Sequence, residues 1–216
     1  MPDVEYEKRA AAEAAAELVE DGFAVGLGTG STVTHFLPAL ARRKLGVRCV
    51  ATSEVTEKAA LDLGLAVEPF DGLDRLDIAI DGADQVDPAG WLVKGGGGAH
   101  TREKIVASAA ERFVVIVSSN KLVDQIVPPV PLELLAYGAA ATIRRLGRVV
   151  LRDAPPSPDG GLIADYMEEV GDPATLAARL VATPGVVEHG LFPPQLVGEI
   201  LVGRGSAVER MTASRS

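Results

Sequence analysis

The segment from Lys94 to Lys104, KGGGGAHTREK, combines a cation, a bare backbone and a carboxylate in one short stretch. The four glycines Gly95–Gly98 carry no side chain and can adopt positive φ, so a ligand can approach the main chain closely. Thr101 is a predicted helix N-cap, which places Glu103 in a first helical turn, where the macrodipole favours the ionised carboxylate. A general base needs that form. First-turn preference would explain an isolated glutamate, but Lys94 and the glycines favour chemistry on an anionic intermediate.

A second glycine-containing loop, Gly26–Thr32, lies between a predicted strand and a predicted helix. Such a loop presents backbone N–H groups and a helix N-terminus at one point, which suits an anion. The loop lacks the Gly-Lys-Ser/Thr ending of a Walker motif, and Ser31 replaces the third glycine of the dinucleotide fingerprint. A tight turn with Ser31 as N-cap is the alternative. The added hydroxyls of Thr29 and Thr32 favour a phosphate site.

An acidic loop, Asp81–Asp87, directly follows the apolar strand predicted at 77–80. Open α/β sheets bind ligands at the carboxyl ends of their strands, so Asp81 and Asp84 could accept sugar hydroxyls or relay protons. Their spacing of three differs from the alternate spacing of a calcium loop, and we predict no metal. An Asx-turn explains Asp87.

Two lysines complete the candidate cations. Lys121 follows the strand predicted at 113–117, although a solvated surface lysine is the default interpretation there. Lys8 shares a helical stripe with Ala12 and Val19, which directs it toward the protein body. Helical phase alone leaves the alternative that Lys8 extends along the rim of the core. None of the three histidines has the spacing of a metal site or a catalytic triad.

The elements that must position these residues alternate along the first part of the chain. Helices are predicted at 3–20, 32–45, 54–63 and 101–112, and strands at 23–27, 47–52, 65–70, 77–80, 91–94 and 113–117. Pro38 lies inside a predicted helix, where we expect a kink or a split. Apolar strands alternating with helices indicate an α/β fold, with a Rossmann-like, mostly parallel sheet covered by helices on both faces.

The composition changes at Val127–Pro131, where three prolines indicate a domain boundary. Beyond a first strand bordered by these prolines, we predict a helix at 132–146, strands at 148–153 and 161–166, a helix at 173–182 and a strand at 185–191. This β-α-β-β-α-β order matches a ferredoxin-like unit. We therefore predict a Rossmann-like catalytic domain formed by 1–127 and 197–216, and a smaller α+β domain formed by 128–196.

The whole chain excludes several classes of protein. Its 216 residues carry a formal net charge of −9, which argues against a nucleic-acid partner. No apolar run reaches the ~18 residues that a membrane helix needs. The charged residues 1–10 contain no apolar signal region, so we expect a cytoplasmic protein. The single cysteine, Cys49, excludes an internal disulfide and a multi-cysteine zinc site, and its predicted strand indicates a buried, inert thiol.

Taken in order, these motifs resemble ribose-5-phosphate isomerase of the A type. The resemblance rests on Gly28–Thr32, Asp81–Asp84, Lys94–Gly97 and Thr101–Lys104, and is extended by Ala51–Ser53, Thr56–Glu57 and Pro184–Phe192. Each motif is weak alone, but the ordered set is highly specific. It differs from many members at Gly98-Ala99-His100, where they have Ala-Ala-Leu; the extra glycine could loosen the loop. We expect the proline-rich loop at 154–161 to be a peripheral variation.

The resemblance implies the interconversion of ribose 5-phosphate and ribulose 5-phosphate, in the non-oxidative branch of the pentose phosphate pathway, by a homodimer without metal or cofactor. It implies that Glu103 is the base that moves a proton between C1 and C2 through an enediolate, and that Lys94 stabilises the charge. Asp81 and Asp84 would bind hydroxyls and assist proton movement between oxygens. The implied substrate-binding residues are Thr29, Gly30, Ser31, Thr32, Asp81, Gly82, Ala83, Asp84, Lys94, Gly95, Gly96, Gly97, Lys121 and Lys8.

Three other functions compete with this one. A sugar-phosphate-sensing domain of a transcription regulator would need a helix-turn-helix segment, and the chain is acidic. A nicotinamide-dependent oxidoreductase could use Glu54 as its ribose-binding acid, but the dinucleotide fingerprint is broken. A coenzyme A transferase would use Glu103 as a nucleophile, and a stable glutamyl thioester would identify it.

Overall fold

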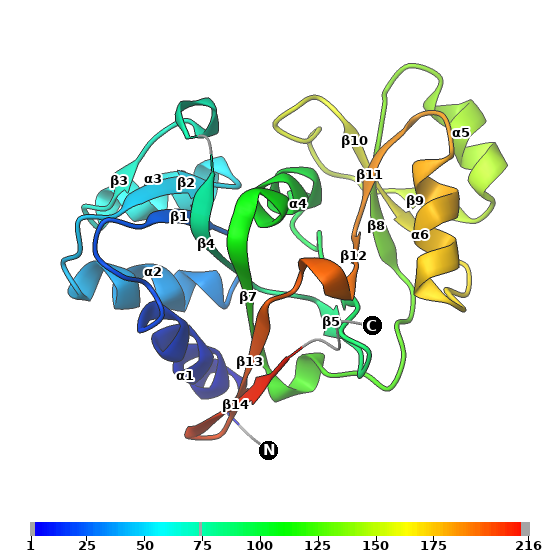
Figure 1. The fold of residues 1–216 in the computed structure, drawn as a ribbon. Coiled ribbons are helices and arrows are strands. Elements are labelled where there is room, and N and C mark those ends of the chain that lie inside the picture. The colour runs from blue at the N-terminus through cyan, green and yellow to red at the C-terminus, as the bar shows by residue number, and fades with distance from the viewer. Residues whose placement is uncertain (1–2, 74, 213–216) are drawn as a thin grey trace.

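The computed structural model describes residues 3–73 and 75–212, which form an α/β structure built around three sheets (Figure 1). The largest sheet has seven strands in the order β14-β13-β7-β4-β1-β2-β3. All its neighbouring strands are parallel except β14, which is antiparallel to β13. The strands are β1 (Ala24–Leu27), β2 (Arg48–Ala51), β3 (Ala66–Val67), β4 (Leu76–Asp81), β7 (Ala110–Ser118), β13 (Glu199–Arg204) and β14 (Ala207–Met211).

Helices cover both faces of this sheet, as the sequence predicts. They are α1 (Val4–Ala16), α2 (Val33–Arg42), α3 (Glu54–Asp62) and α4 (His100–Ala109), with short 3-10 turns η1 (Phe70–Gly72) and η2 (Ser119–Lys121). In β7, Val114 and Ile116 pack with α1 and α2 in one core cluster, whereas Val115 and Val117 pack with α4 in another. Burial on both faces explains the continuous apolar run of this strand.

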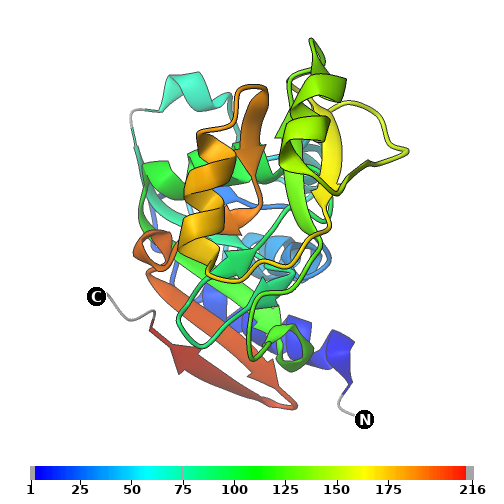
Figure 2. The same ribbon diagram turned by 90° about the vertical axis from the view of Figure 1, so that its right-hand side faces the viewer.

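Residues 130–189 form a second unit with the predicted β-α-β-β-α-β order (Figure 2). Its four-stranded sheet has the order β11-β8-β10-β9, and all neighbouring strands are antiparallel. The elements are β8 (Val130–Leu134), α5 (Ala139–Leu146), β9 (Val149–Leu151), β10 (Leu162–Tyr166), α6 (Pro173–Val181) and β11 (Val186–His189). The predicted fold class is confirmed.

A three-stranded sheet, ordered β12-β6-β5, lies beside the acidic and glycine loops. It consists of β5 (Gln85–Val86), β6 (Leu92–Val93) and β12 (Leu191–Phe192), and the turn η3 (Pro194–Leu196) follows it. Asp87 accepts a hydrogen bond from the Trp91 N–H at 2.9 Å and so closes the turn between β5 and β6, but the bond reaches four residues along the chain rather than the two of the predicted Asx-turn. The chain then returns to the large sheet through β13, which pairs in parallel with β7.

Several predicted element boundaries are wrong. The helix α4 ends at Ala109 rather than 112, because Arg112 pairs with Ile78 as part of β7. The helix predicted at 132–146 begins only at Ala139, since residues 130–134 form the fully buried strand β8. The first helix ends at Ala16 rather than 20, and α2 continues through Pro38 without a split.

Cys49 lies fully buried in β2, as predicted. Burial, together with the charge of Glu68, raises the pKa of its thiol to about 12, so the thiolate needed for nucleophilic attack is absent near neutral pH. Among the described residues, no helix is both long enough and apolar enough to cross a membrane.

Candidate active site

A cavity of about 240 Å³ lies at the carboxyl ends of β1, β4 and β7. It is lined by Thr29, Gly30, Ser31, Thr32, Gly82, Ala83, Asp84, Lys94, Gly95, Gly96, Gly97, Glu103 and Lys121. The structure therefore brings together on one cavity wall all the predicted site residues except Asp81 and Lys8. Asp81 lies behind the cavity wall, where it contacts Lys94. Lys8 does not line the cavity and pairs with Glu5.

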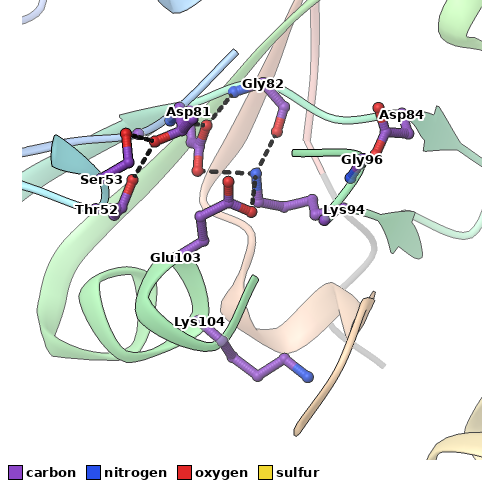
Figure 3. Close-up of polar contacts among 12 residues, drawn as sticks. Thr52, Ser53, Asp81, Gly82, Asp84, Lys94, Gly96, Glu103 and Lys104 are labelled. Atoms are coloured by element: carbon purple, nitrogen blue, oxygen red, sulfur yellow. Dashed lines mark hydrogen bonds and ion pairs between the residues drawn. The ribbon is translucent and has the colours of Figure 1, made fainter. Parts of the chain in front are cut away.

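Lys94 occupies the centre of the polar cluster (Figure 3). Its Nζ lies 2.8 Å from Oδ2 of Asp81 and 3.1 Å from Oε2 of Glu103, and it donates to the Gly82 carbonyl at 2.6 Å. The side chain is only 2% exposed. Burial lowers the pKa of Lys94, but the charges of Asp81 and Glu103 outweigh it and raise the pKa above its ordinary value. The buried ammonium group therefore stays charged.

Glu103 lies in the first turn of α4, as predicted, with its carboxyl directed at Lys94 (Figure 3). Burial raises its pKa to about 8, an effect that Lys94 reduces and Asp81 increases. Within the described residues, its Oε2 contacts Lys94 as an ion pair but makes no well-aligned hydrogen bond. Lys94 is thus the one polar partner of that oxygen within the described residues.

The Thr101 N-cap predicted for α4 is wrong, and the alternative interpretation of Ser31 as the N-cap of α2 is not observed either. Ala99, without a side-chain cap, precedes α4, whereas Thr101 lies inside the helix and donates its hydroxyl to the buried carboxylate of Glu133. Likewise Thr32 rather than Ser31 precedes α2, and it makes no side-chain cap. The hydroxyls of the 26–32 loop are thus not consumed by capping α2.

Asp81 and Asp84 hold the two glycine-containing loops in place. Asp81 accepts N–H bonds from Thr29 at 3.1 Å and Gly82 at 2.7 Å, and burial raises its pKa despite the opposing effect of Lys94. A Cβ on Gly28 would lie 1.9 Å from the Asp81 carboxyl carbon, so only glycine fits there. Asp84 accepts the N–H of Gly96 at 2.8 Å.

Three of the four positions in the glycine run require glycine, two because of their backbone conformation and one because a neighbouring side chain approaches closely. Gly95 and Gly98 have φ of +98° and +76°, and the Gly98 N–H closes the turn onto the Gly95 carbonyl at 3.0 Å. A Cβ on Gly96 would lie 3.0 Å from the Asp84 carboxylate. The extra glycine relative to the expected pattern therefore serves a left-handed turn. Gly97 lines the cavity, and a Cβ there would meet only Thr29 Cγ2, at 3.9 Å.

Arg152, which sequence reasoning missed, fixes this loop from the second unit. Its Nη1 donates to the Gly95 and Gly96 carbonyls, both at 2.9 Å. Its Nε and Nη2 form a bidentate pair with Asp165 at 2.8 and 2.7 Å. The sequence gives no signal for this contact, because it joins segments far apart in the chain.

A cluster of hydroxyl groups supports the 26–32 loop. The Thr29 hydroxyl lies 2.8 Å from those of both Thr52 and Ser53 and 3.2 Å from that of Thr56. Thr56 also donates to the Gly28 carbonyl at 2.9 Å. Thr52, Ser53 and Thr56, which belong to the family pattern, therefore contact the 26–32 loop directly.

The two additional lysines lie differently. Lys121, in η2, lines the cavity. Lys8 is largely covered while Arg9 is exposed, as helical phase predicts, but its Nζ contacts Glu5 at 2.6 Å and does not line the cavity. A substrate contact by Lys8 stays a prediction.

Sequence reasoning also missed Glu7, which is 1% exposed. It accepts hydrogen bonds from the Ser119 N–H and hydroxyl at 2.9 and 2.7 Å, and from the Gly205 N–H at 3.1 Å. These bonds hold the segment that leads to Lys121. Helical phase predicts the burial of Glu7, because this residue lies four positions before the buried Ala11 on the same helical stripe.

The loop at 154–161 is not peripheral, contrary to our expectation. Its Asp159 forms a bidentate pair with Arg102 of α4, at 2.8 and 2.7 Å. Its Ser157 donates to the buried Glu133. The loop thus contacts the residue next to Glu103.

His100 lies fully buried at the start of α4, against Gly95. Burial, with the charge of Lys104, lowers its pKa to about 4. The imidazole is therefore neutral near pH 7, and His100 packs in the interior as an uncharged side chain.

Comparisons with known proteins agree with this geometry. The family model of ribose 5-phosphate isomerase A (phosphoriboisomerase A) matches residues 48–207. The chain is 41% identical to the ribose-5-phosphate isomerase A of Caulobacter sp. (strain K31), over 95% of this chain and 97% of that one.

Solved structures give the same result. The ribose 5-phosphate isomerase A of Neisseria gonorrhoeae superposes with a TM-score of 0.94, at 31% identity and over the whole of both chains. A D-ribose-5-phosphate isomerase in complex with phospho-erythronic acid superposes with a TM-score of 0.91, at 33% identity, over 97% of this chain and 99% of that one. The chain therefore belongs to the ribose-5-phosphate isomerase A family.

Proposed function

We propose that the chain interconverts D-ribose 5-phosphate and D-ribulose 5-phosphate in the cavity beside Lys94, through an enediolate. The observation that carries this proposal is the 3.1 Å contact between Lys94 Nζ and Glu103 Oε2, inside a buried site. A base and a cation held at this distance can act on adjacent atoms of one substrate. The sugar's C2 carries the proton to be removed, and the C1 oxygen receives the negative charge.

Glu103 is the proposed proton carrier. Its carboxylate takes the proton from C2 of ribose 5-phosphate, and the electrons of that C–H bond form the C1–C2 double bond of an enediolate. The protonated carboxyl then delivers the proton to C1, while the O2 hydroxyl loses its proton and O1 gains one. One carboxylate can serve both carbons because they are adjacent. No step requires an oxidant, a reductant or a metal ion.

Lys94 is the proposed electrostatic stabiliser of the enediolate. Preorganised positive charge in a site without water is worth more than in solution, and it needs no reorganisation as the negative charge develops. The contacts with Asp81 and Gly82 hold the ammonium group in position before substrate arrives. We assign to Asp84, which lines the cavity, the binding of sugar hydroxyls and the transfer of the proton between O1 and O2. For Asp81 the same role stays a prediction, because its carboxyl lies behind the cavity wall against Lys94.

The loop from Thr29 to Thr32 and Lys121 form the proposed phosphate end of the cavity. Backbone N–H groups at the start of α2 and the hydroxyls of Ser31 and Thr32 suit a phosphate group. A solved relative is described in complex with phospho-erythronic acid, which supports a phosphorylated polyol as the ligand. Lys8 would have to leave Glu5 to add its charge at this end.

We also propose that the enzyme is a cytoplasmic homodimer. The proposed catalytic domain comprises 1–127 and 197–216, and the smaller domain comprises 128–196. The strand order supports this division, because β13 lies beside β7 in the large sheet while β8 to β11 form their own sheet. Light scattering after gel filtration tests the dimer.

An isomerase assay on ribose 5-phosphate, with and without a chelator, tests the proposed function. We expect turnover that the chelator leaves unchanged and that Glu103→Gln reduces by about 100-fold to 10,000-fold, the usual contribution of general base catalysis. Substrate binding should be retained. Glu111→Gln is the matched control, since Glu111 lies on the surface against Arg75. Near-normal turnover of Glu103→Gln would contradict the base assignment, and loss of activity with the chelator would contradict the metal-free mechanism.

A further inference from the structure

The segment Pro184–Phe192 is part of the family resemblance, yet the proposed reaction gives it no role. Its end lies directly against Lys94. The Gly190 carbonyl accepts the Lys94 N–H at 2.8 Å, and Leu191 pairs with Val93 across β12 and β6. A Cβ on Gly190 would lie 2.2 Å from the Lys94 carbonyl oxygen, so the two main chains are in close contact. This segment therefore fixes the backbone from which the Lys94 side chain extends.

The ring of Phe192 lies next to the buried cation. It is fully buried, and Lys94 Nζ lies over it at 5.5 Å from the ring centroid. An ammonium group within about 6 Å of an aromatic face is attracted by the ring quadrupole, and the attraction is larger where water is excluded. The ring accepts no strong hydrogen bond, so the three N–H groups of Lys94 remain available for Asp81, Glu103 and Gly82.

A second cation shares this ring. Lys104 Nζ lies over Phe192 at 4.9 Å from the centroid, and it bonds Glu188 and the His189 carbonyl, both at 2.7 Å. Lys104 leaves α4 on the side away from the Lys94 cluster (Figure 3). Because Lys104 directly follows Glu103, these contacts join α4, which carries the proposed base, to β12, which carries Phe192.

We propose that Phe192 is a positioning residue whose ring holds the ammonium group of Lys94 by a cation–π interaction. Lys104 anchors the strand that carries the ring to α4. The proposal rests on the proposed function, in which Lys94 stabilises the enediolate. A ring that attracts Lys94 from the protein side keeps the ammonium group in place when the substrate takes over the contacts of Glu103.

Fluorinated phenylalanines at position 192 test this role. Each added fluorine withdraws electron density from the ring face and changes ring volume little. We expect kcat for ribose 5-phosphate to fall stepwise from phenylalanine through the mono-, di- and trifluoro analogues, by about tenfold in total, with KM nearly unchanged. The same series at Phe113 is the matched control. That ring is also buried, lies 6.4 Å from Phe192, and has no ammonium group over it within the described residues.

Repeating the position-192 series in a Lys104→Met background separates the two cations. A dependence of kcat on fluorine number that persists without Lys104 supports the proposal, because the effect then acts through Lys94. A dependence that disappears in this background, or is absent from the start, overturns it. A kcat that falls equally in the Phe113 series also overturns it, since packing would then be the cause. If the wild-type enzyme turns over and only the fluorine dependence is missing, the proposed function survives and this inference fails.

Discussion

Lys94 and Glu103 lie at opposite ends of the glycine run, yet Lys94 Nζ and Glu103 Oε2 are 3.1 Å apart. The run folds back on itself through the left-handed residues Gly95 and Gly98, which allows β6 and the start of α4 to meet. The charged pair is therefore a consequence of the turn between these elements. Substitutions in the cluster should separate electrostatics from loop geometry.

Replacement of Lys94 by Met should abolish most activity and also destabilise the fold. Removing the cation leaves Asp81 and Glu103 as two buried carboxyl groups without compensation, and breaking a buried pair costs about 3–5 kcal/mol. The loss of enediolate stabilisation should lower kcat by about 100-fold or more. Urea unfolding and steady-state kinetics measure the two effects.

Lys58→Met is the control for Lys94→Met. Lys58 forms an exposed pair with Asp62, and such pairs contribute less than about 1 kcal/mol. A Lys94→Met protein as stable as Lys58→Met would contradict the buried charge cluster.

The pH dependence of kcat/KM should report the ionisation of Glu103. Burial raises the pKa of this carboxyl from its ordinary value of 4.5 to about 8, an effect that Lys94 offsets only in part. The base must be deprotonated, so activity is gained as pH rises through this pKa and falls about tenfold per pH unit below it. Kinetics at closely spaced pH values give the midpoint. A profile that is flat through pH 8 would show that Glu103 is already ionised or is not the base.

Gly28→Ala should damage catalysis without a change in the charges. The added methyl group would lie 1.9 Å from the carboxyl carbon of Asp81, so the carboxyl that pairs with Lys94 must shift. We expect kcat to fall by at least about tenfold, with the larger part of the effect in kcat. Gly72→Ala, where the methyl group meets nothing closer than 3.5 Å, is the matched control. Equal kinetics for the two variants would contradict the required close approach.

Arg152→Met should loosen the glycine loop from the second unit. The change removes both bonds to the Gly95 and Gly96 carbonyls and leaves Asp165 without its partner. Because the loop lines the cavity, we expect KM to rise by at least about tenfold, since tenfold is about 1.4 kcal/mol and each hydrogen bond to a charged group contributes at least about that much. Arg144→Met, on the exposed side of α5, is the control. A KM equal to that of the control would contradict the role of Arg152.

Much of the large sheet could be predicted from the sequence, because both its faces are buried. Ile78 and Ile80 contact one layer of helices and Ala79 the other, so the strand is apolar throughout. The start of the second unit could not be predicted in this way. The two-residue spacing of Leu132 and Leu134 suits a strand, but so short an apolar run does not by itself decide between strand and helix, and β8 is selected by its two neighbours, β10 and β11. Those partners are distant in the sequence.

The site residues show the same difference between local and long-range determinants. Asp81 ends β4 and Asp84 follows it, Lys94 follows β6, and Glu103 lies in the first turn of α4. Composition and position next to a strand or helix end are both visible in the sequence. Contacts between distant segments, such as Arg152 with the glycine loop, depend on the packing of two separate sheets. The local periodicity of the sequence does not predict such packing.

The most direct test of the account is the exchange of the C2 hydrogen of ribose 5-phosphate with solvent, followed by NMR in D₂O. A carboxyl base that carries the proton can exchange it, so the wild-type enzyme should incorporate deuterium into the sugar during turnover. Glu103→Gln should bind the same substrate but incorporate deuterium at least about 100-fold more slowly. Deuterium incorporation by Glu103→Gln at the wild-type rate would contradict the central claim that Glu103, held beside Lys94, is the base.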